Sequence, residues 1–91
     1  MKVVFTRPAL SDLDEIRQYI LDNYPALAGL VEQRIHIVLE RIAKYPRSAR
    51  IVHQRPDVRV VPVIRFPYKI FYRITQAKII EILHIHHTAR D

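Results

Sequence analysis

Apolar residues recur at steps of three and four along two stretches in the first half of the chain. These stripes consist of Leu10, Leu13, Ile16, Ile20 and Tyr24, and of Leu27, Val31, Ile35, Val38, Ile42 and Tyr45. Such spacing is typical of helices that bury one face. We expect the first helix to end near Asn23-Tyr24, before Pro25, and the second to end before Pro46. Because few residues separate them, the helices are expected to form an antiparallel hairpin.

β-Branched and aromatic residues predict four strands around this hairpin. The first covers Lys2–Thr6, and Thr6 is expected to cap the following helix, with Pro8 in its first turn. The other three strands are predicted over Val58–Ile64, Tyr68–Thr75 and Lys78–His87. Between helix and strands, Pro46–Pro56 is polar and basic and is bounded by prolines, so it is predicted to be a loop.

The predicted order is therefore β-α-α-β-β-β, in one domain covering residues 1–91. Short connections between the last three strands favour an antiparallel meander. A helical hairpin packed on one face of an antiparallel sheet would bury both helix stripes. We therefore predict an α+β fold of this kind.

Alternation along the strands sorts the side chains into two faces. The face toward the helices is expected to hold Tyr68, Ile70, Tyr72 and Ile74, with both tyrosines in the core. The outward face is expected to hold Arg59, Lys69, Arg73, Glu81 and His87. On the last strand, the side opposite Glu81 and His87 is expected to carry Ile80, Ile82, His84 and His86. Glu81 has a simple structural interpretation as a cross-strand partner of Lys69 or Arg73.

Charge changes this picture because it is unevenly distributed. The net charge is +6. Residues 1–45 hold six basic and six acidic side chains, whereas residues 46–91 hold nine basic and three acidic ones. The whole excess therefore lies in the second half, where it favours an anionic partner, either nucleic acid or an acidic protein. Charge alone does not separate these partners from a general solubility effect.

The absence of cysteine excludes disulfides and thiolate zinc sites, and fits a reducing cytosol. No apolar run resembles a signal peptide or a membrane span, so we expect a cytoplasmic protein that does not contact the membrane. His84 and His86 have a spacing that can bring two metal ligands together. Apart from Asp91, however, no carboxylate near them in the sequence completes a set. We therefore expect structural or surface histidines, with no metal and no cofactor.

Taken in order, three segments of the chain resemble the RelE/ParE superfamily of toxins, also called plasmid stabilisation proteins. They are the pattern Ala9, Asp12-Leu13, Ile16 and Tyr19-Ile20; the pair Val58-Arg59 with the run Phe66–Arg73; and the ending Ile80–Asp91. The ending is similar to the tail of the ParE-like branch. The resemblance implies the toxin of a type II toxin–antitoxin module, whose neighbouring gene encodes a neutralising antitoxin. The basic charge suits an acidic, partly disordered partner of this kind.

The superfamily contains two activities. ParE-like members inhibit DNA gyrase by binding it, whereas RelE-like members cut messenger RNA on the ribosome. RelE-type enzymes tend to carry an arginine, and commonly a tyrosine, shortly after the last strand. Here no tyrosine follows Tyr72, and Arg90 alone could take the arginine role, in a shifted register. We therefore expect a ParE-like gyrase inhibitor, which is not an enzyme.

For this inhibitor, the expected target-binding residues are Arg59, Lys69, Arg73, His87 and Arg90. Their replacement by alanine is expected to reduce toxicity more than folding, since exposed charges contribute little to stability. If the protein is instead an RNase, the catalytic candidates are His87, Arg90 and Arg65, because cleavage at a 2′-hydroxyl needs an acid, a base and cations. A degenerate, non-toxic relative is the third interpretation.

Overall fold

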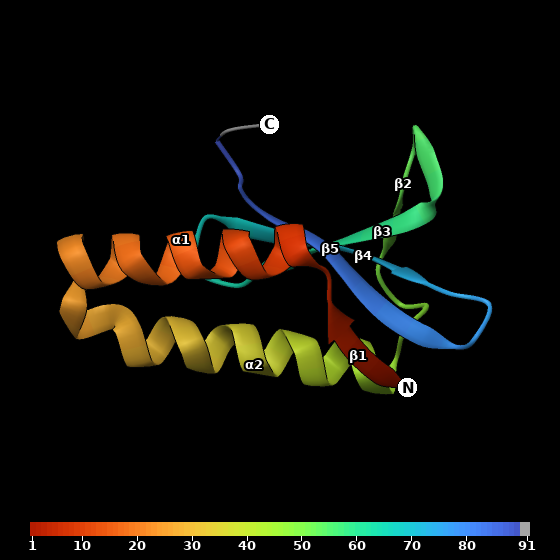
Figure 1. Cartoon of the computed structure of the whole chain (residues 1–91), viewed down its shortest axis with the longest axis horizontal. Helices are drawn as coiled ribbons and strands as arrows, with labels where there is room; N and C mark the ends of the chain where they lie inside the picture. The colour runs from red at the N-terminus through yellow and green to blue at the C-terminus, as the bar shows by residue number, and fades with distance from the viewer. Residues whose placement is uncertain (90–91) are drawn as a thin grey trace.

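The structure is a computed structural model that describes residues 1–89. Its elements are β1 (Lys2–Phe5), α1 (Arg7–Asn23), a 3-10 turn η1 (Pro25–Leu27), α2 (Ala28–Lys44), β2 (Arg50–Val52), β3 (Arg55–Val63), β4 (Tyr68–Ile74) and β5 (Ile79–His87). The two helices run side by side and lie against one side of the sheet (Figure 1). Within the described residues, no helix is long and apolar enough to cross a membrane.

Helix α1 begins where the sequence predicts, because Thr6 is its N-cap. The Thr6 Oγ1 atom accepts a hydrogen bond from the Ala9 N–H at 3.3 Å, and Pro8 occupies the first turn. The helix ends before Pro25, as expected, with the Tyr24 N–H donating to the Ile20 carbonyl. Its buried face contains Ala9, Leu13, Ile16 and Ile20.

Helix α2 buries a matching stripe and returns along α1. Its buried residues are Val31, Ile35, Val38 and Ile42. An exposed Arg17–Glu32 ion pair joins the two helices on the solvent side. The predicted helical hairpin is therefore confirmed, and its connection is the 3-10 turn η1.

The sheet has five strands in the order β1-β5-β4-β3-β2. The predicted meander is confirmed as β3-β4-β5, with both pairings antiparallel. Strand β1 pairs in parallel with β5, so the sheet is mixed rather than wholly antiparallel. The long connection from β1 to β5, through both helices and the meander, permits this parallel pairing.

The prediction of a loop over Pro46–Pro56 is wrong for part of that segment. Residues Arg50–Val52 form β2, and β3 begins at Arg55 rather than Val58. The two strands pair antiparallel as a hairpin, with a shift between Ile51 and Val52. Local apolar alternation did not reveal this edge strand, because it is short and mostly exposed and is held by backbone hydrogen bonds.

The core lies between the helices and one face of the sheet, as the alternation in β4 predicts. Ile70, Tyr72, Ile80 and Ile82 are completely buried there, and Tyr68 is nearly so. The core assignment of both tyrosines is confirmed.

A β-bulge interrupts the alternation along β5. Phe71 faces His84 and Tyr72 faces Ile82, so Leu83 has no facing residue on β4. The bulge reverses the side to which later residues point. Ile85 is buried toward the helices, and His84 and His86 face the other way. The expectation that the two histidines share a face with Ile80 and Ile82 is therefore wrong, because one extra residue shifts the two-residue period.

Candidate functional site

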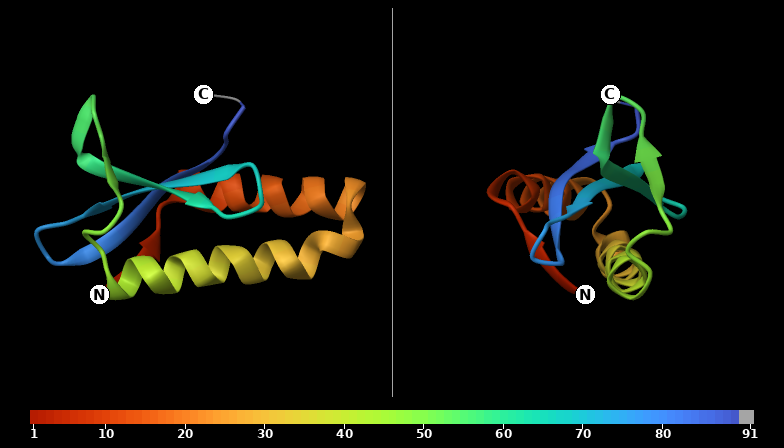
Figure 2. Two further views of the ribbon diagram at one scale, coloured as in Figure 1. Left: turned by 180° about the vertical axis from the view of Figure 1, so that it is seen from behind. Right: turned by 90° about the vertical axis from the view of Figure 1, so that its right-hand side faces the viewer.

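The sheet face turned away from the helices carries most of the predicted binding chemistry. Facing residues of neighbouring strands lie on the same side of a sheet. The open sheet face therefore comprises Val4, Arg50, Val58, Val60, Pro62, Lys69, Phe71, Arg73, Glu81, His84 and His86. Figure 2 shows the β2–β3 hairpin bending away from the helices, which curves the sheet on this side. Although no helix among residues 1–89 covers this face, Val58 and Val60 are only 4% and 8% exposed.

The cations of the open sheet face are partly compensated. The Arg73 Nε atom donates to Glu81 Oε1 at 2.8 Å, which confirms the cross-strand pairing of Glu81. The Lys69 ammonium lies 5.6 Å from the centre of the Phe71 ring, within cation–π range. The result is a semi-apolar surface that keeps a positive excess beside two histidines.

Arg59 lies on the opposite face, so its predicted place beside Lys69 and Arg73 is wrong. It faces Tyr72 across β3 and β4, toward the helix side. Its Nη1 atom donates to the carbonyls of Arg47 and Ala49 at 3.0 and 2.9 Å. The hydroxyl of Tyr72 donates to the carbonyl of Pro46 at 2.7 Å. Arg59 and Tyr72 therefore hold the segment between α2 and β2 against the sheet.

Burial raises the pKa of the Tyr72 phenol above its ordinary value of 10.0, and the positive charge of Arg59 opposes this shift only in part. Tyr72 is thus a neutral structural donor.

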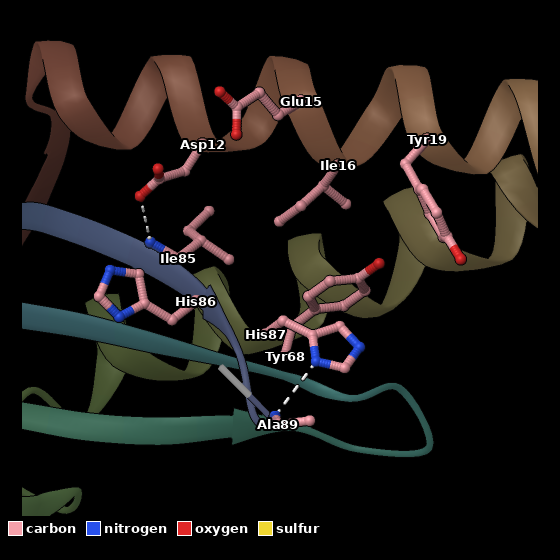
Figure 3. Close-up of a pocket in the computed structure, with 9 residues that line it drawn as sticks. All are labelled: Asp12, Glu15, Ile16, Tyr19, Tyr68, Ile85, His86, His87 and Ala89. Carbon is pink, nitrogen blue, oxygen red and sulfur yellow. Dashed lines mark hydrogen bonds between the residues drawn. The ribbon is translucent and has the colours of Figure 1, made fainter. Parts of the chain in front are cut away.

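His87 also lies on the helix side, because the bulge reverses its direction. It faces Tyr68, and the two rings meet edge to face with centroids 5.6 Å apart. It lines a pocket of about 680 Å³ between α1 and the end of β5, with Glu15, Tyr19 and Tyr68 among the other lining residues. In Figure 3, His86 and His87 point to opposite sides of β5. The predicted outward position of His87 is therefore wrong.

A hydrogen bond to Nδ1 fixes the tautomer of His87. Its Nδ1 atom accepts from the Ala89 N–H at 3.1 Å, so the neutral ring carries its proton on Nε2.

The other predicted nuclease residues lie at the same end of the sheet or beyond the described part. Arg65 is in the β3–β4 turn, with a φ of 75° in the left-handed region. That turn contacts the end of β5, since the Thr88 N–H donates to the Pro67 carbonyl at 2.7 Å. Arg90, predicted for both target binding and catalysis, lies outside the described residues.

Asp12 is a site residue that the sequence did not reveal. From α1, its Oδ2 atom accepts from the Ile85 N–H at 2.9 Å and lies 3.2 Å from His84 Nδ1. The carboxylate thus pairs with the edge of β5 where the short strand β1 has ended. Asp12 and His84 are 72 residues apart, so only the tertiary fold brings them together.

Comparison with known proteins places this fold in a family. The sequence model described as "ParE toxin of type II toxin-antitoxin system, parDE" matches residues 3–91. Toxin RelE2 of Caulobacter vibrioides is 33% identical over 90 residues, covering 98% of this chain and 97% of that protein.

Two solved structures share the architecture. A chain of the chromosomal ParDE system from P. aeruginosa superposes with a TM-score of 0.81 at 27% identity, covering 96% of this chain and 95% of the other. The isolated E. coli RelE toxin superposes with a TM-score of 0.69 at 16% identity, covering 99% and 86%. The second likeness concerns the fold alone. By the family match along nearly its whole length, this chain belongs to the ParE toxins of type II toxin–antitoxin systems.

Proposed function

We propose that this ParE-family toxin inhibits DNA gyrase by binding it through the open sheet face. Family membership supplies the coarser statement, a type II toxin with a cognate antitoxin as its partner. The gyrase target and the mode of action are the proposed part, as is an acidic antitoxin encoded by the neighbouring gene.

The position of His87 relative to the cations carries this proposal. Cleavage of RNA needs an acid, a base and cations around the same phosphate. His87 faces α1, whereas Lys69 and Arg73 face away from the helices. A phosphate held by these two cations is therefore separated from His87 by the sheet. This separation argues against His87, the predicted catalytic histidine, as the acid or base of RNA cleavage at these cations, and so supports a binding function.

Burial of the tyrosines supports the same conclusion. Tyr68 and Tyr72 are 4% and 0% exposed. Neither ring is available to stack on an unpaired base, as tyrosines in single-strand binding sites do.

The composition of the open sheet face suits a protein partner. Phe71 is partly exposed there above the buried Val58 and Val60, and Lys69 and Arg73 stand next to it. Protein interfaces commonly combine an apolar centre with a charged rim, and the positive charge would attract an acidic partner surface. Lys69 and Arg73 therefore keep their target-binding role in this proposal. Arg59 and His87 do not.

Ribosome-dependent cleavage of messenger RNA is the second candidate. The likeness to a protein named RelE2 favours it, as does the placement of His86 directly opposite Lys69 on the open sheet face. In that case the acid or base would be His84 or His86, beside the cations, and not His87.

Gyrase and RNA assays on the purified protein distinguish these functions. We expect inhibition of gyrase supercoiling, relieved by the antitoxin, and no new codon-level cuts in primer extension of messenger RNA after induction. New cuts without gyrase inhibition would establish the nuclease instead. Lys69→Ala is expected to weaken inhibition while the protein stays folded, with a loss of stability of about 1 kcal/mol or less from its contact with Phe71. Arg41→Ala, which removes an equal charge from exposed α2, serves as the control.

Two further measurements address the partner and the degenerate alternative. Toxin and antitoxin should co-elute at moderate salt, and separate elution would refute the pairing. Induction without the neighbouring gene should arrest growth, and induction with it should not. Normal growth in both cases would identify a degenerate relative.

A further inference from the structure

The outer edge of β5 brings two imidazoles and one carboxylate together. Asp12, His84 and His86 each offer one ligand atom, and these atoms all lie within 4.8 Å of one another. The two histidine rings have centroids 4.9 Å apart, and Asp12 Oδ2 lies 3.2 Å from His84 Nδ1. None of the functions discussed above uses this cluster as a unit.

We propose that Asp12, His84 and His86 bind one divalent transition-metal ion of the zinc type. Two histidines and a carboxylate are a donor set that suits Zn²⁺ and leaves a fourth tetrahedral position open. In such a complex, ligand atoms about 2.0–2.1 Å from the metal lie roughly 3.4 Å from one another. The observed separations exceed this value by at most about 1.4 Å. Small rotations of exposed side chains can close that difference.

The fold holds these ligands in place before any ion arrives. The spacing of two residues places His84 and His86 on the same side of β5, and the bulge at Leu83 turns that side to the open sheet face. The Ile85 N–H anchors the Asp12 carboxylate through Oδ2 at 2.9 Å. This anchor uses only Oδ2, so in the described part of the chain the other carboxylate oxygen can serve as a metal ligand. His84 would then coordinate the ion in place of its present contact with Asp12 Oδ2, or through Nε2.

Access and charge are compatible with an ion. The side chains of His84 and Asp12 are 46% and 24% exposed, so an ion can enter from solvent. The Asp12 carboxylate offsets one of the two positive charges of the ion, which matters beside Lys69, the residue facing His86. A bound ion would connect the start of α1 to the end of β5 and extend the positive surface of the open sheet face.

Zinc titration of the full chain, free of any purification tag and treated with a chelator, tests this proposal. In competition with a chromophoric chelator, the protein should bind one zinc ion per chain. In NMR spectra, the ring signals of His84 and His86 should shift when zinc is added. His84→Gln, His86→Gln and Asp12→Asn should each weaken binding by about tenfold or more. Asp12→Asn keeps an oxygen that can accept from the Ile85 N–H, so it tests the ligand with less risk to the fold.

The matched control is His36→Gln. His36 is exposed and pairs with Glu40 on α2, so it offers an imidazole and a carboxylate without a third ligand. Its replacement should leave the zinc affinity within about twofold, while circular dichroism verifies that every variant is folded. Absence of saturable binding would overturn the proposal. Equal weakening by His36→Gln, or a stoichiometry that follows the number of histidines, would also overturn it.

Discussion

Arg59→Ala should destabilise this protein, although sequence reasoning assigned Arg59 to target binding. The substitution removes two hydrogen bonds from a charged donor to the carbonyls of Arg47 and Ala49. Hydrogen bonds to charged groups contribute about 1.5–3 kcal/mol each when well shielded. One of these two bonds is exposed and the other partly buried. We therefore expect a total loss of about 1–2 kcal/mol after discounting for solvent.

Urea unfolding followed by circular dichroism measures this loss. With an m-value of about 1 kcal/mol/M for a domain of this size, the midpoint should fall by about 1–2 M. The melting temperature should fall by roughly 4–16 °C. The control is Arg55→Ala, which removes the same charge from the same strand and, within residues 1–89, breaks an exposed ion pair with Asp57. Such a pair contributes about 0–1 kcal/mol.

A double-mutant cycle with Tyr72→Phe sharpens the test. Both side chains hold the segment between α2 and β2, since Tyr72 donates to the carbonyl of Pro46. Their effects should therefore be non-additive by about 0.5 kcal/mol or more. If Arg59→Ala shifts the midpoint no further than Arg55→Ala, the structural role assigned to Arg59 is refuted.

Three further predictions concern the core and the edge of the sheet. The free energy of unfolding should decline as the pH rises above about 10, because the unfolded chain releases the Tyr72 proton while the folded chain, in which the Tyr72 pKa is raised, retains it. Urea titrations at several pH values should show a smaller decline for Tyr72→Phe, and an equal decline in both proteins would contradict the assignment. Asp12→Ala should cost about 1–3 kcal/mol and speed hydrogen exchange at the Ile85 amide, which loses its acceptor; unchanged exchange there would argue against the anchor. Ile82→Ala should cost about 2–5 kcal/mol in urea unfolding, because Ile82 is completely buried; a cost under about 1 kcal/mol would be inconsistent with its place in the core.

Sequence reasoning succeeded where one period governed a whole element. The central members of both helix stripes are buried as predicted, whereas the end members are exposed, namely Leu10, Tyr24, Leu27 and Tyr45. Thr6 and Pro8 identify the start of α1 without tertiary information. Alternation in β4 correctly placed Ile70 and Tyr72 on the buried side and Lys69 on the other side, because the strand has no bulge and one of its sides is buried along most of its length.

The same reasoning failed where a tertiary contact decided the outcome. The sequence contains no residue type that indicates the bulge at Leu83. His84 was therefore predicted on the helix side and His87 on the open side, and the structure shows the reverse. Strand β1 lies beside β5 only after the entire chain has folded, so its parallel pairing has no local signal. Asp12 reads in sequence as a favourable charge near a helix N-terminus, and only the fold shows that it reaches β5.

The bulge connects these separate observations, and Thr6 holds it in place. The Thr6 hydroxyl donates to the carbonyls of Ile82 and Leu83 at 2.8 and 3.2 Å, and its oxygen accepts from the Ala9 N–H. One side chain therefore fixes both the start of α1 and the irregularity in β5. Because α1 starts at this point, Asp12 lies one to two turns further along, within reach of the Ile85 N–H. The same irregularity places one pair of histidines beside the cations and leaves His87 beside Tyr68. Which histidines lie beside the cations, and with them the proposed metal site, thus depend on one unpaired residue in the last strand.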